Sequence, residues 1–323
     1  MIRTTTAATT TTKKAKLFFS GAMILALGCG TGRTSQWEAK PPAATAAASS
    51  PAGDGAGKPA TATATDTAEA LLAAAEAAWQ QRGSQAKTEE AIAAWEKATA
   101  ARPDDGVTLA KLSRGLYFLA DGHLRKLGTK SDAYLAAFER GTAAGERALA
   151  ALSPSFKSKV MSGEKVEDAI KVMGPEGLEA MYWYAVNLGK WSRAKGFAAT
   201  LGNKDRVKGV MSRALELSPS FFHAAPHRYF GAFYAVAPSF AGGDLDKSRE
   251  HYETSLKMAP NYVGTKIIMA ETYATKKQDR ALFDRLIAEV LAVPDEVIPG
   301  LEPETRVEKE KAMELKAQGD ALF

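Results

Sequence analysis

From Thr67 to its end, this 323-residue chain is composed mainly of helix-forming residues. No segment in that part shows the two-residue alternation of a half-buried strand. A chain without strands buries its apolar side chains only by packing helix against helix, so we predict an all-α fold. The predicted helices span residues 68–81, 88–101, 107–126, 131–152, 164–172, 176–200, 204–217, 225–237, 245–258, 263–275, 281–293 and 304–322.

Four of these helices end with the same pattern, a small residue followed five or six positions later by a proline. The pairs are Ala98 with Pro103, Ala148 with Pro154, Ala214 with Pro219, and Ser255 with Pro260. Small residues let paired helices approach closely, and proline cannot continue a helix. The pattern resembles tetratricopeptide repeats. The prolines lie 51, 65 and 41 residues apart, which predicts degenerate repeats with enlarged helices in a compact bundle or solenoid.

The start of the chain has the features of an export signal. Three lysines in residues 13–16 precede an apolar run at 17–27, which is too short to span a membrane as a helix. The run ends at Gly28 and Cys29, and the sequence Ala-Leu-Gly-Cys resembles the lipobox of bacterial lipoproteins. We therefore expect residues 1–28 to be a cleaved signal peptide and Cys29 to carry a lipid.

Cys29 is the only cysteine in the chain, so no disulfide framework exists. The alternatives are an ordinary signal peptide with an incidental cysteine, or a buried thiol. Gly30 follows at the position where an aspartate would resemble the inner-membrane retention signal. The expected location is periplasmic, with a lipid anchor in the outer membrane.

Cleavage would also change the charge of the chain. Four of the 42 Lys and Arg residues and none of the 37 Asp and Glu residues lie in 1–28, which leaves 38 against 37 and a net charge of +1. A basic surface for nucleic acid is therefore not expected. Residues 29–66 are built from Ala, Thr, Pro, Ser and Gly, and this composition predicts a disordered tether. A flexible coil of that length would span on the order of 35 Å. Residues 67–323 form the helical domain.

Two segments of the helical domain resemble a known family. They are the aromatic stretch YWYAVNLGKW at 182–191 and the loop PSFAGGDLDKS at 238–248. Both are similar to the T component (TatT) of tetratricopeptide-associated TRAP transporters, and the resemblance covers about residues 68–293. It implies a periplasmic, lipid-anchored, helical protein that pairs with the substrate-binding P subunit and handles hydrophobic organic acids. Some members form trimers with a pore through each subunit, so a homo-oligomer is also implied.

The aromatic helix is the first candidate for a ligand site. Tyr184, Leu188 and Trp191 share one face, and Asn187 places an amide beside the Trp183 ring. The simpler interpretation is a core helix whose rings fill the space between repeat layers. In the functional interpretation, Tyr184, Asn187 and Trp191 line a cavity for an amphipathic acid, because an amide is costly to bury without a partner.

A second candidate lies in the following helix. Arg228 could form a bidentate contact with a substrate carboxylate, with Tyr229 beside it, although an ordinary salt bridge is the alternative. His223 and His227 have the four-residue spacing of metal ligands, but Pro226 separates them and no acidic or cysteine cluster stands nearby. We therefore expect no metal and no cofactor.

The remaining motifs favour a protein without catalysis. The Gly-Gly-Asp sequence at 242–244 lacks the Gly-Lys-Ser/Thr ending of a phosphate loop and predicts a tight turn, with Asp244 capping the next helix. The charged run at 308–311 predicts a solvated face for the last helix. No nucleophilic triad, HExxH motif or paired carboxylate signature is present.

These features together predict a non-enzymatic lipoprotein accessory to TRAP-type solute uptake. We expect it to bind the substrate-binding subunit and a small hydrophobic organic acid in a central cavity. The alternative is a tetratricopeptide scaffold lipoprotein that organises envelope proteins and binds no ligand. A third class, an envelope enzyme with an unfamiliar site, stays open because missing motifs do not exclude it.

Overall fold

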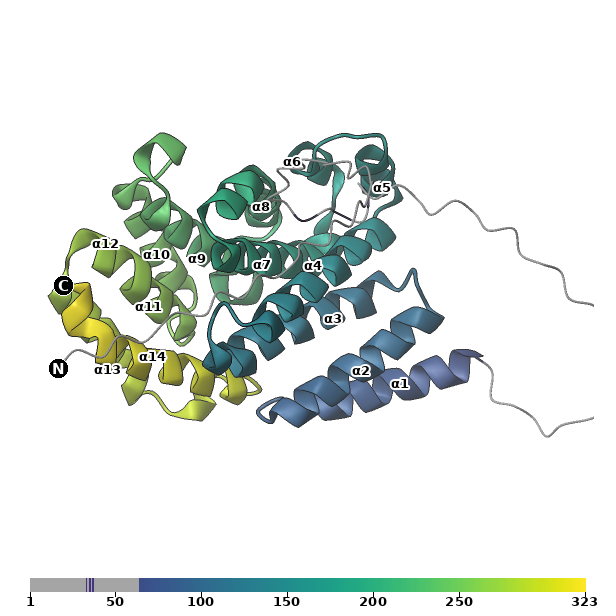
Figure 1. The fold of residues 1–323 in the computed structure, drawn as a ribbon, viewed down its shortest axis with the longest axis horizontal. Coiled ribbons are helices and arrows are strands. Elements are labelled where there is room, and N and C mark those ends of the chain that lie inside the picture. Colours follow the sequence, from purple (N-terminus) through teal and green to yellow (C-terminus); the bar gives the residue numbers. More distant parts are fainter. Residues whose placement is uncertain (1–32, 34, 36, 38–63) are drawn as a thin grey trace, which may run out of the picture. The chain divides into compact units, whose positions relative to one another are not determined.

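The computed structural model describes residues 33, 35, 37 and 64–323. These residues form helices and turns without a strand, which confirms the all-α prediction (Figure 1). No helix in the described part of the chain is long and apolar enough to cross a bilayer. The signal peptide at 1–28, Cys29 and most of the predicted tether lie outside the described residues.

The N-terminal half is built from helical hairpins. Helices pack against their neighbours in sequence, α1 on α2, α3 on α4 and α7 on α8, and α4 also packs against α7. The bounds are α1 (Ala64–Trp79), α2 (Gln85–Ala101), α3 (Gly106–Phe118), α4 (Asp132–Leu152), α5 (Pro154–Met161), α6 (Val166–Ala169), α7 (Leu178–Lys195) and α8 (Phe197–Leu217). A π-helical turn, η1 (Leu119–His123), continues α3.

The C-terminal half continues this pattern with α9 on α10 and α13 on α14. Its helices are α9 (Phe221–Val236), α10 (Leu245–Met258), α11 (Gly264–Met269), α12 (Thr275–Lys277), α13 (Arg280–Ala292) and α14 (Glu302–Leu322), with a second π-helical turn, η6 (Ala270–Ala274), between α11 and α12. The last helix returns to the N-terminal half, where Glu304 pairs with Arg82 at 2.8 Å. This return brings the two halves together around one space.

The helix ends fall where the proline pattern predicts them. The helices α2, α4, α8 and α10 each end two residues before their proline. The small residues of the pattern are all buried, at 0–2% exposure: Ala98, Ala148, Ala214 and Ser255. A side chain of this size lets the neighbouring helix approach, while the proline stops the chain from continuing as a helix.

Some predicted boundaries are wrong. The break between α7 and α8 falls at Gly196, whose φ of 115° favours glycine, so α8 begins at Phe197 and not at the predicted residue 204. Helix α1 begins at Ala64, before its predicted start at residue 68. The helix α5 was not predicted. Asp244 does cap α10, since its carboxylate accepts hydrogen bonds from the amides of residues 246 and 247.

The described apolar side chains form two clusters. The larger cluster joins α1 to α8, and its biggest fully buried rings are Trp95, Phe138, Phe156 and Tyr184. The smaller cluster joins α10 to α14 around Tyr252 and other buried residues. Helix α9 contributes to both clusters, so it is the element that connects the two halves.

Three residues of the predicted tether lie against the helical domain. Arg33 binds Glu146, Ser35 accepts a hydrogen bond from Arg206, and the Trp37 ring packs against core rings. The composition of residues 29–66 did not predict these contacts.

Candidate functional site

A cavity of about 500 Å³ lies where the two halves of the domain meet. Its walls come from α3, α7, α8, α9, α11 and α14 and from both π-helical turns. A π-helical turn is rare and is found frequently at functional sites. Here Asp121 and Gly122 of η1, and Glu271 and Thr272 of η6, line the same space. The volume is within the range of small-molecule sites.

The first turn of α9 has an unusual backbone at the wall of this cavity. Phe222, His223 and Ala224 have φ values of 41°, 58° and 55°, in the left-handed region that side chains other than glycine disfavour. Each such residue costs on the order of 1 kcal/mol or more. Pro226 follows two residues later, where the right-handed helix begins. The turn directs two backbone carbonyls toward the side chain of Arg228.

Arg228 is the guanidinium at the centre of this arrangement. It is 4% exposed, and it donates hydrogen bonds to the carbonyl of His223 at 2.9 Å and of Phe222 at 3.4 Å. Its charge also lies 4.3 Å from the centre of the Tyr262 ring. Burial disfavours the charged form, but Tyr182 and Tyr262 hold the pKa of Arg228 above its usual value. Among the described residues no carboxylate forms a salt bridge with it.

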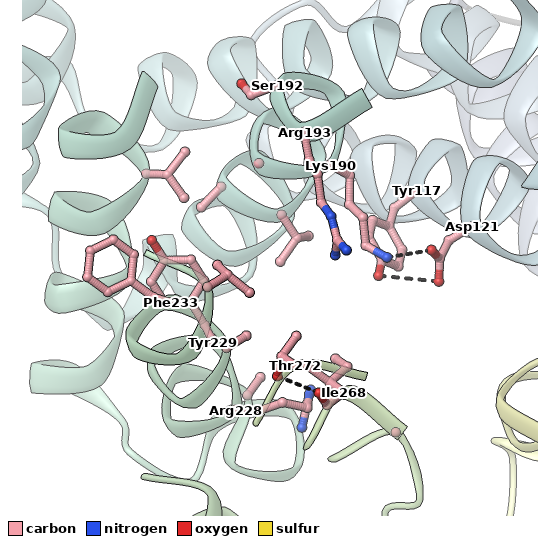
Figure 2. A pocket seen from close by; sticks show the side chains of 18 of the residues that line it. Tyr117, Asp121, Lys190, Ser192, Arg193, Arg228, Tyr229, Phe233, Ile268 and Thr272 are labelled. Atoms are coloured by element: carbon pink, nitrogen blue, oxygen red, sulfur yellow. Dashed lines mark hydrogen bonds and ion pairs between the residues drawn. The ribbon is translucent and has the colours of Figure 1, made fainter. Parts of the chain in front are cut away.

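The facing wall carries a buried ion network. Asp121 binds Lys190 at 2.8 Å (Figure 2). It also binds Lys311 at 2.5 Å, and Lys311 binds Glu308 at 2.9 Å. Burial would raise the pKa of the Asp121 carboxyl, but the two lysines lower it well below its usual range. Lys311 in turn keeps a raised pKa despite burial, because Asp121 and Glu308 favour its charge. This network fixes α14 to η1 and α7.

The other cavity arginines already have acidic partners. Arg193 binds Glu271 at 2.8 Å, and Arg114 lies 3.7 Å from Glu304. Figure 2 shows Arg193 and Lys190 reaching into the space from one side, with Arg228 on the other. The lining includes six basic and four acidic side chains, namely Arg114, Lys190, Arg193, Lys204, Arg228 and Lys311 against Asp121, Glu271, Glu304 and Glu308. The lining therefore carries a surplus of positive charge, and among the described residues the buried Arg228 has no carboxylate partner.

A large part of the remaining lining is apolar, and some of it reaches the surface. Its aromatic and aliphatic members include Phe118, Trp183, Val186, Val207, Phe222, Phe233, Ile267 and Ile268. Three further lining residues are well exposed, Phe197 at 67%, Val236 at 57% and Leu201 at 46%. Large exposed apolar side chains at an opening are typical of an interaction surface. We call these three residues the apolar mouth.

The predicted site residues fall into two groups. Arg228 and Tyr229 line the cavity, whereas Tyr184, Asn187 and Trp191 are not among its lining residues. The amide of Asn187 is buried, and it donates to the carbonyl of Ser113 at 3.0 Å and thereby joins α7 to α3. The aromatic helix does reach the cavity, but with its other face, which carries Trp183, Val186, Gly189, Lys190 and Arg193.

The two histidines of the predicted pair have different contact partners. His227 Nδ1 is 3.0 Å from His251 Nδ1, and the His223 ring stacks on Tyr262 at 4.9 Å. Burial is the first cause of the lowered pKa of each of these three histidines, which are therefore neutral at pH 7. No group of three or more metal-ligating side chains occurs in the part of the chain that the structure describes.

Several cavity residues were missed by sequence reasoning. The charged run of α14 was predicted to be a solvated face, but the side chains of Glu308 and Lys311 are only 15% and 16% exposed and line the cavity. Asp121 was not singled out, because its two lysines lie 69 and 190 residues away in the sequence. The only local signal was an acidic residue within an otherwise apolar helix, at 119–122.

A comparison with protein families identifies the family of this chain. The family model described as TRAP transporter T-component matches residues 132–323, which include α4 to α14 and most of the cavity lining. No curated protein matches the chain. The match confirms the predicted family resemblance. The chain belongs to the TRAP transporter T-component family.

Proposed function

We propose that this accessory component of a TRAP transporter binds a small hydrophobic organic acid in the cavity, with the carboxylate at Arg228. The observation that carries the proposal is a buried guanidinium without a carboxylate partner among the described residues, at the wall of a cavity that also has large apolar surfaces. Arginine stays protonated in proteins, so its buried charge favours an anionic ligand. Its planar fork fits a carboxylate in a bidentate contact.

The surrounding residues agree with an amphipathic ligand. The indole Nε1 of Trp183 is buried and has no hydrogen-bond partner among the described residues, so a ligand oxygen could accept from it. The apolar walls would cover the hydrocarbon part, which contributes about 0.8 kcal/mol for each buried CH₂ group. The π-helical turns and the left-handed turn shape the space between these groups.

We further propose that the protein acts in the periplasm, held to the outer membrane by a lipid on Cys29, and that it docks the substrate-binding subunit of the transporter. The apolar mouth supports the docking, because a partner that covered Phe197, Leu201 and Val236 would also close the cavity against water. A small acid could then pass between the two proteins without crossing solvent. A homo-oligomer is a further part of this proposal.

Binding of octanoate, measured by isothermal titration calorimetry, tests the ligand site. The variant Arg228→Met should bind about ten- to hundredfold more weakly, since a charge-assisted contact contributes about 1.5–3 kcal/mol. Arg285→Met, which removes an exposed arginine on α13, is the matched control and should bind like the wild type. 1-Octanol and octylamine, with equal chain length but no carboxylate, should bind more weakly than octanoate.

Two results would count against this function. If octanoate does not bind, or if Arg228→Met and Arg285→Met bind it equally well, the acid site is wrong. For the partner, Phe197→Asp should weaken co-purification of the substrate-binding subunit, while Met161→Asp, at another exposed apolar residue, should not. Recovery of unrelated envelope proteins in its place would favour the scaffold alternative.

A further inference from the structure

Arg33, Ser35 and Trp37 contact the helical domain in the way that a bound peptide does. The Arg33 guanidinium makes a bidentate contact with Glu146 of α4, at 2.5 and 2.9 Å. Both side chains are buried, at 7% and 0% exposure. A bidentate pair of this kind fixes the orientation of both partners.

The next two contacts lie on neighbouring helices. Ser35 is fully buried, and its hydroxyl accepts a hydrogen bond from Arg206 of α8 at 2.7 Å. Trp37 meets Phe156 of α5 edge to face with ring centres 5.7 Å apart, and it lies 6.2 Å from the Tyr184 ring of α7. Such ring pairs contribute beyond the area that they bury. Arg33, Ser35 and Trp37 therefore contact four helices between them, namely α4, α8, α5 and α7.

The three described residues of this segment all contact the helical domain. Arg33, Ser35 and Trp37 lie at every second position of the sequence, and Trp37 lies in a turn. Peptides recognised in this way combine a charged anchor and an aromatic anchor in fixed pockets. The pockets here are the buried carboxylate of Glu146 and the space between Phe156 and Tyr184. We call the surface formed by these residues and Arg206 the α4–α8 groove.

We propose that the α4–α8 groove is a peptide-binding site and that residues 33–37 are its intramolecular ligand. The segment fastens the beginning of the exported chain to the helical domain. This site is separate from the cavity, because Glu146, Phe156, Tyr184 and Arg206 are not among the cavity lining.

The consequence for anchoring rests on the proposed lipid at Cys29. Four residue steps separate Cys29 from Arg33, and these span at most about 14 Å. A free tether of the whole 29–66 segment would span on the order of 35 Å. The bound segment therefore shortens the connection between the lipid and the domain and selects the α4–α8 groove as the attached face.

A synthetic peptide with the sequence of residues 31–40, carrying a fluorophore, tests the groove by fluorescence anisotropy. The protein is the exported chain with Cys29→Ser, so that lipid plays no part. In an open variant, Arg33→Ala with Trp37→Ala, the groove should bind the peptide. In the wild-type sequence the internal segment competes at an effective concentration on the order of 1 mM. A peptide with a Kd of about 10 µM would then bind the wild-type sequence about a hundredfold more weakly.

Changes in the groove and in the peptide provide the controls. Glu146→Gln in the open variant should weaken peptide binding at least about tenfold. Glu253→Gln, which removes an exposed carboxylate on α10, should have little effect. A peptide with Arg33→Glu should not bind. No binding to the open variant, equal binding to both chains, or indifference to Glu146 would each overturn the proposal.

Hydrogen exchange gives a test that needs no variant to fold. The amides of residues 33–37 should exchange at least about tenfold more slowly in the wild-type sequence than in the free peptide. Exchange at the rate of the free peptide would overturn the proposal. Lipidation is tested separately, by the mass of the N-terminal peptide from the exported wild-type protein, so the anchor and the groove can fail independently.

Discussion

Removing the Asp121 carboxylate should destabilise the domain strongly, because it breaks a buried ion network. Asp121 is 6% exposed in its side chain and lies between the ammonium groups of Lys190 and Lys311. The substitution Asp121→Asn keeps the shape of the side chain but leaves two positive charges beside each other. It also removes one of the contacts that attach α14 to the N-terminal half, while the pair of Glu304 with Arg82 stays.

The magnitude follows from the burial of the three side chains. Breaking a fully buried ion pair by removing one partner costs about 3–5 kcal/mol. Lys311 is 16% exposed, but Lys190 is 34% exposed, so solvent screens part of its interaction. We therefore expect a loss of about 2–4 kcal/mol in the free energy of unfolding. For a domain of this size, that corresponds to a decrease of about 4–16 °C in Tm.

Thermal and urea unfolding followed by circular dichroism measure this loss. The matched control is Asp168→Asn, which removes a carboxylate from an exposed pair with Lys171, with the two side chains 54% and 71% exposed. Solvent screens such an exposed pair, so its loss should change stability little. If Asp121→Asn loses no more stability than Asp168→Asn, the ion network does not hold the halves of the domain together.

The same variant has an opposite effect on the ligand site. Without the Asp121 charge, the cavity lining becomes more positive by one unit, so a carboxylate ligand should bind more tightly while the fold becomes weaker. Octanoate titration at a temperature well below Tm separates the two effects. Weaker binding of octanoate by the folded variant would contradict an anion site in this cavity.

Two further predictions concern packing and pH. Gly145→Ala should lower the free energy of unfolding by about 1–3 kcal/mol, because a Cβ there would lie 2.8 Å from the backbone of Tyr184. The control Gly202→Ala, in open space, should stabilise α8 by up to about 1 kcal/mol. If urea unfolding gives the opposite order of stabilities, α4 and α7 do not pack this closely. Burial lowers the pKa of His227 and His251 in the folded protein, so these histidines bind protons more readily in the unfolded chain. The folded state should therefore have its full stability above about pH 6.5, the pKa of an unperturbed histidine, and lose stability toward pH 5. Urea midpoints at pH 7.5 and 5.0 test this, and the decrease should be smaller in His227→Gln with His251→Gln.

The sequence predicted the features that depend on neighbouring residues. Proline cannot extend a helix, so the ends of α2, α4, α8 and α10 were predicted closely from Pro103, Pro154, Pro219 and Pro260. The cap of α10 by Asp244 was also predicted, because a helix cap depends only on residues next to it in the sequence. The break at Gly196 was placed a few residues late, because the flanking residues also favour helix and only the glycine φ shows where the chain turns.

The candidate site was predicted only in part. Arg228 and Tyr229 were found because an arginine within an aromatic helix start is a local pattern. The aromatic helix 182–191 was also found, but not which of its faces meets the cavity, since rings and charges occur on both faces. Periodicity shows that residues share a face, and it does not show what that face contacts.

The sequence by itself determined the helical class, the helix ends and the family resemblance, because these depend on composition and on spacing over a few residues. Only the tertiary structure decided which surfaces enclose the cavity, because its walls join residues as far apart as Asp121 and Lys311, which are 190 positions apart. The same holds for Arg33 and Glu146, which are 113 positions apart. Ion pairs over such separations form only after many helices have packed, since no local preference of the chain brings their members together.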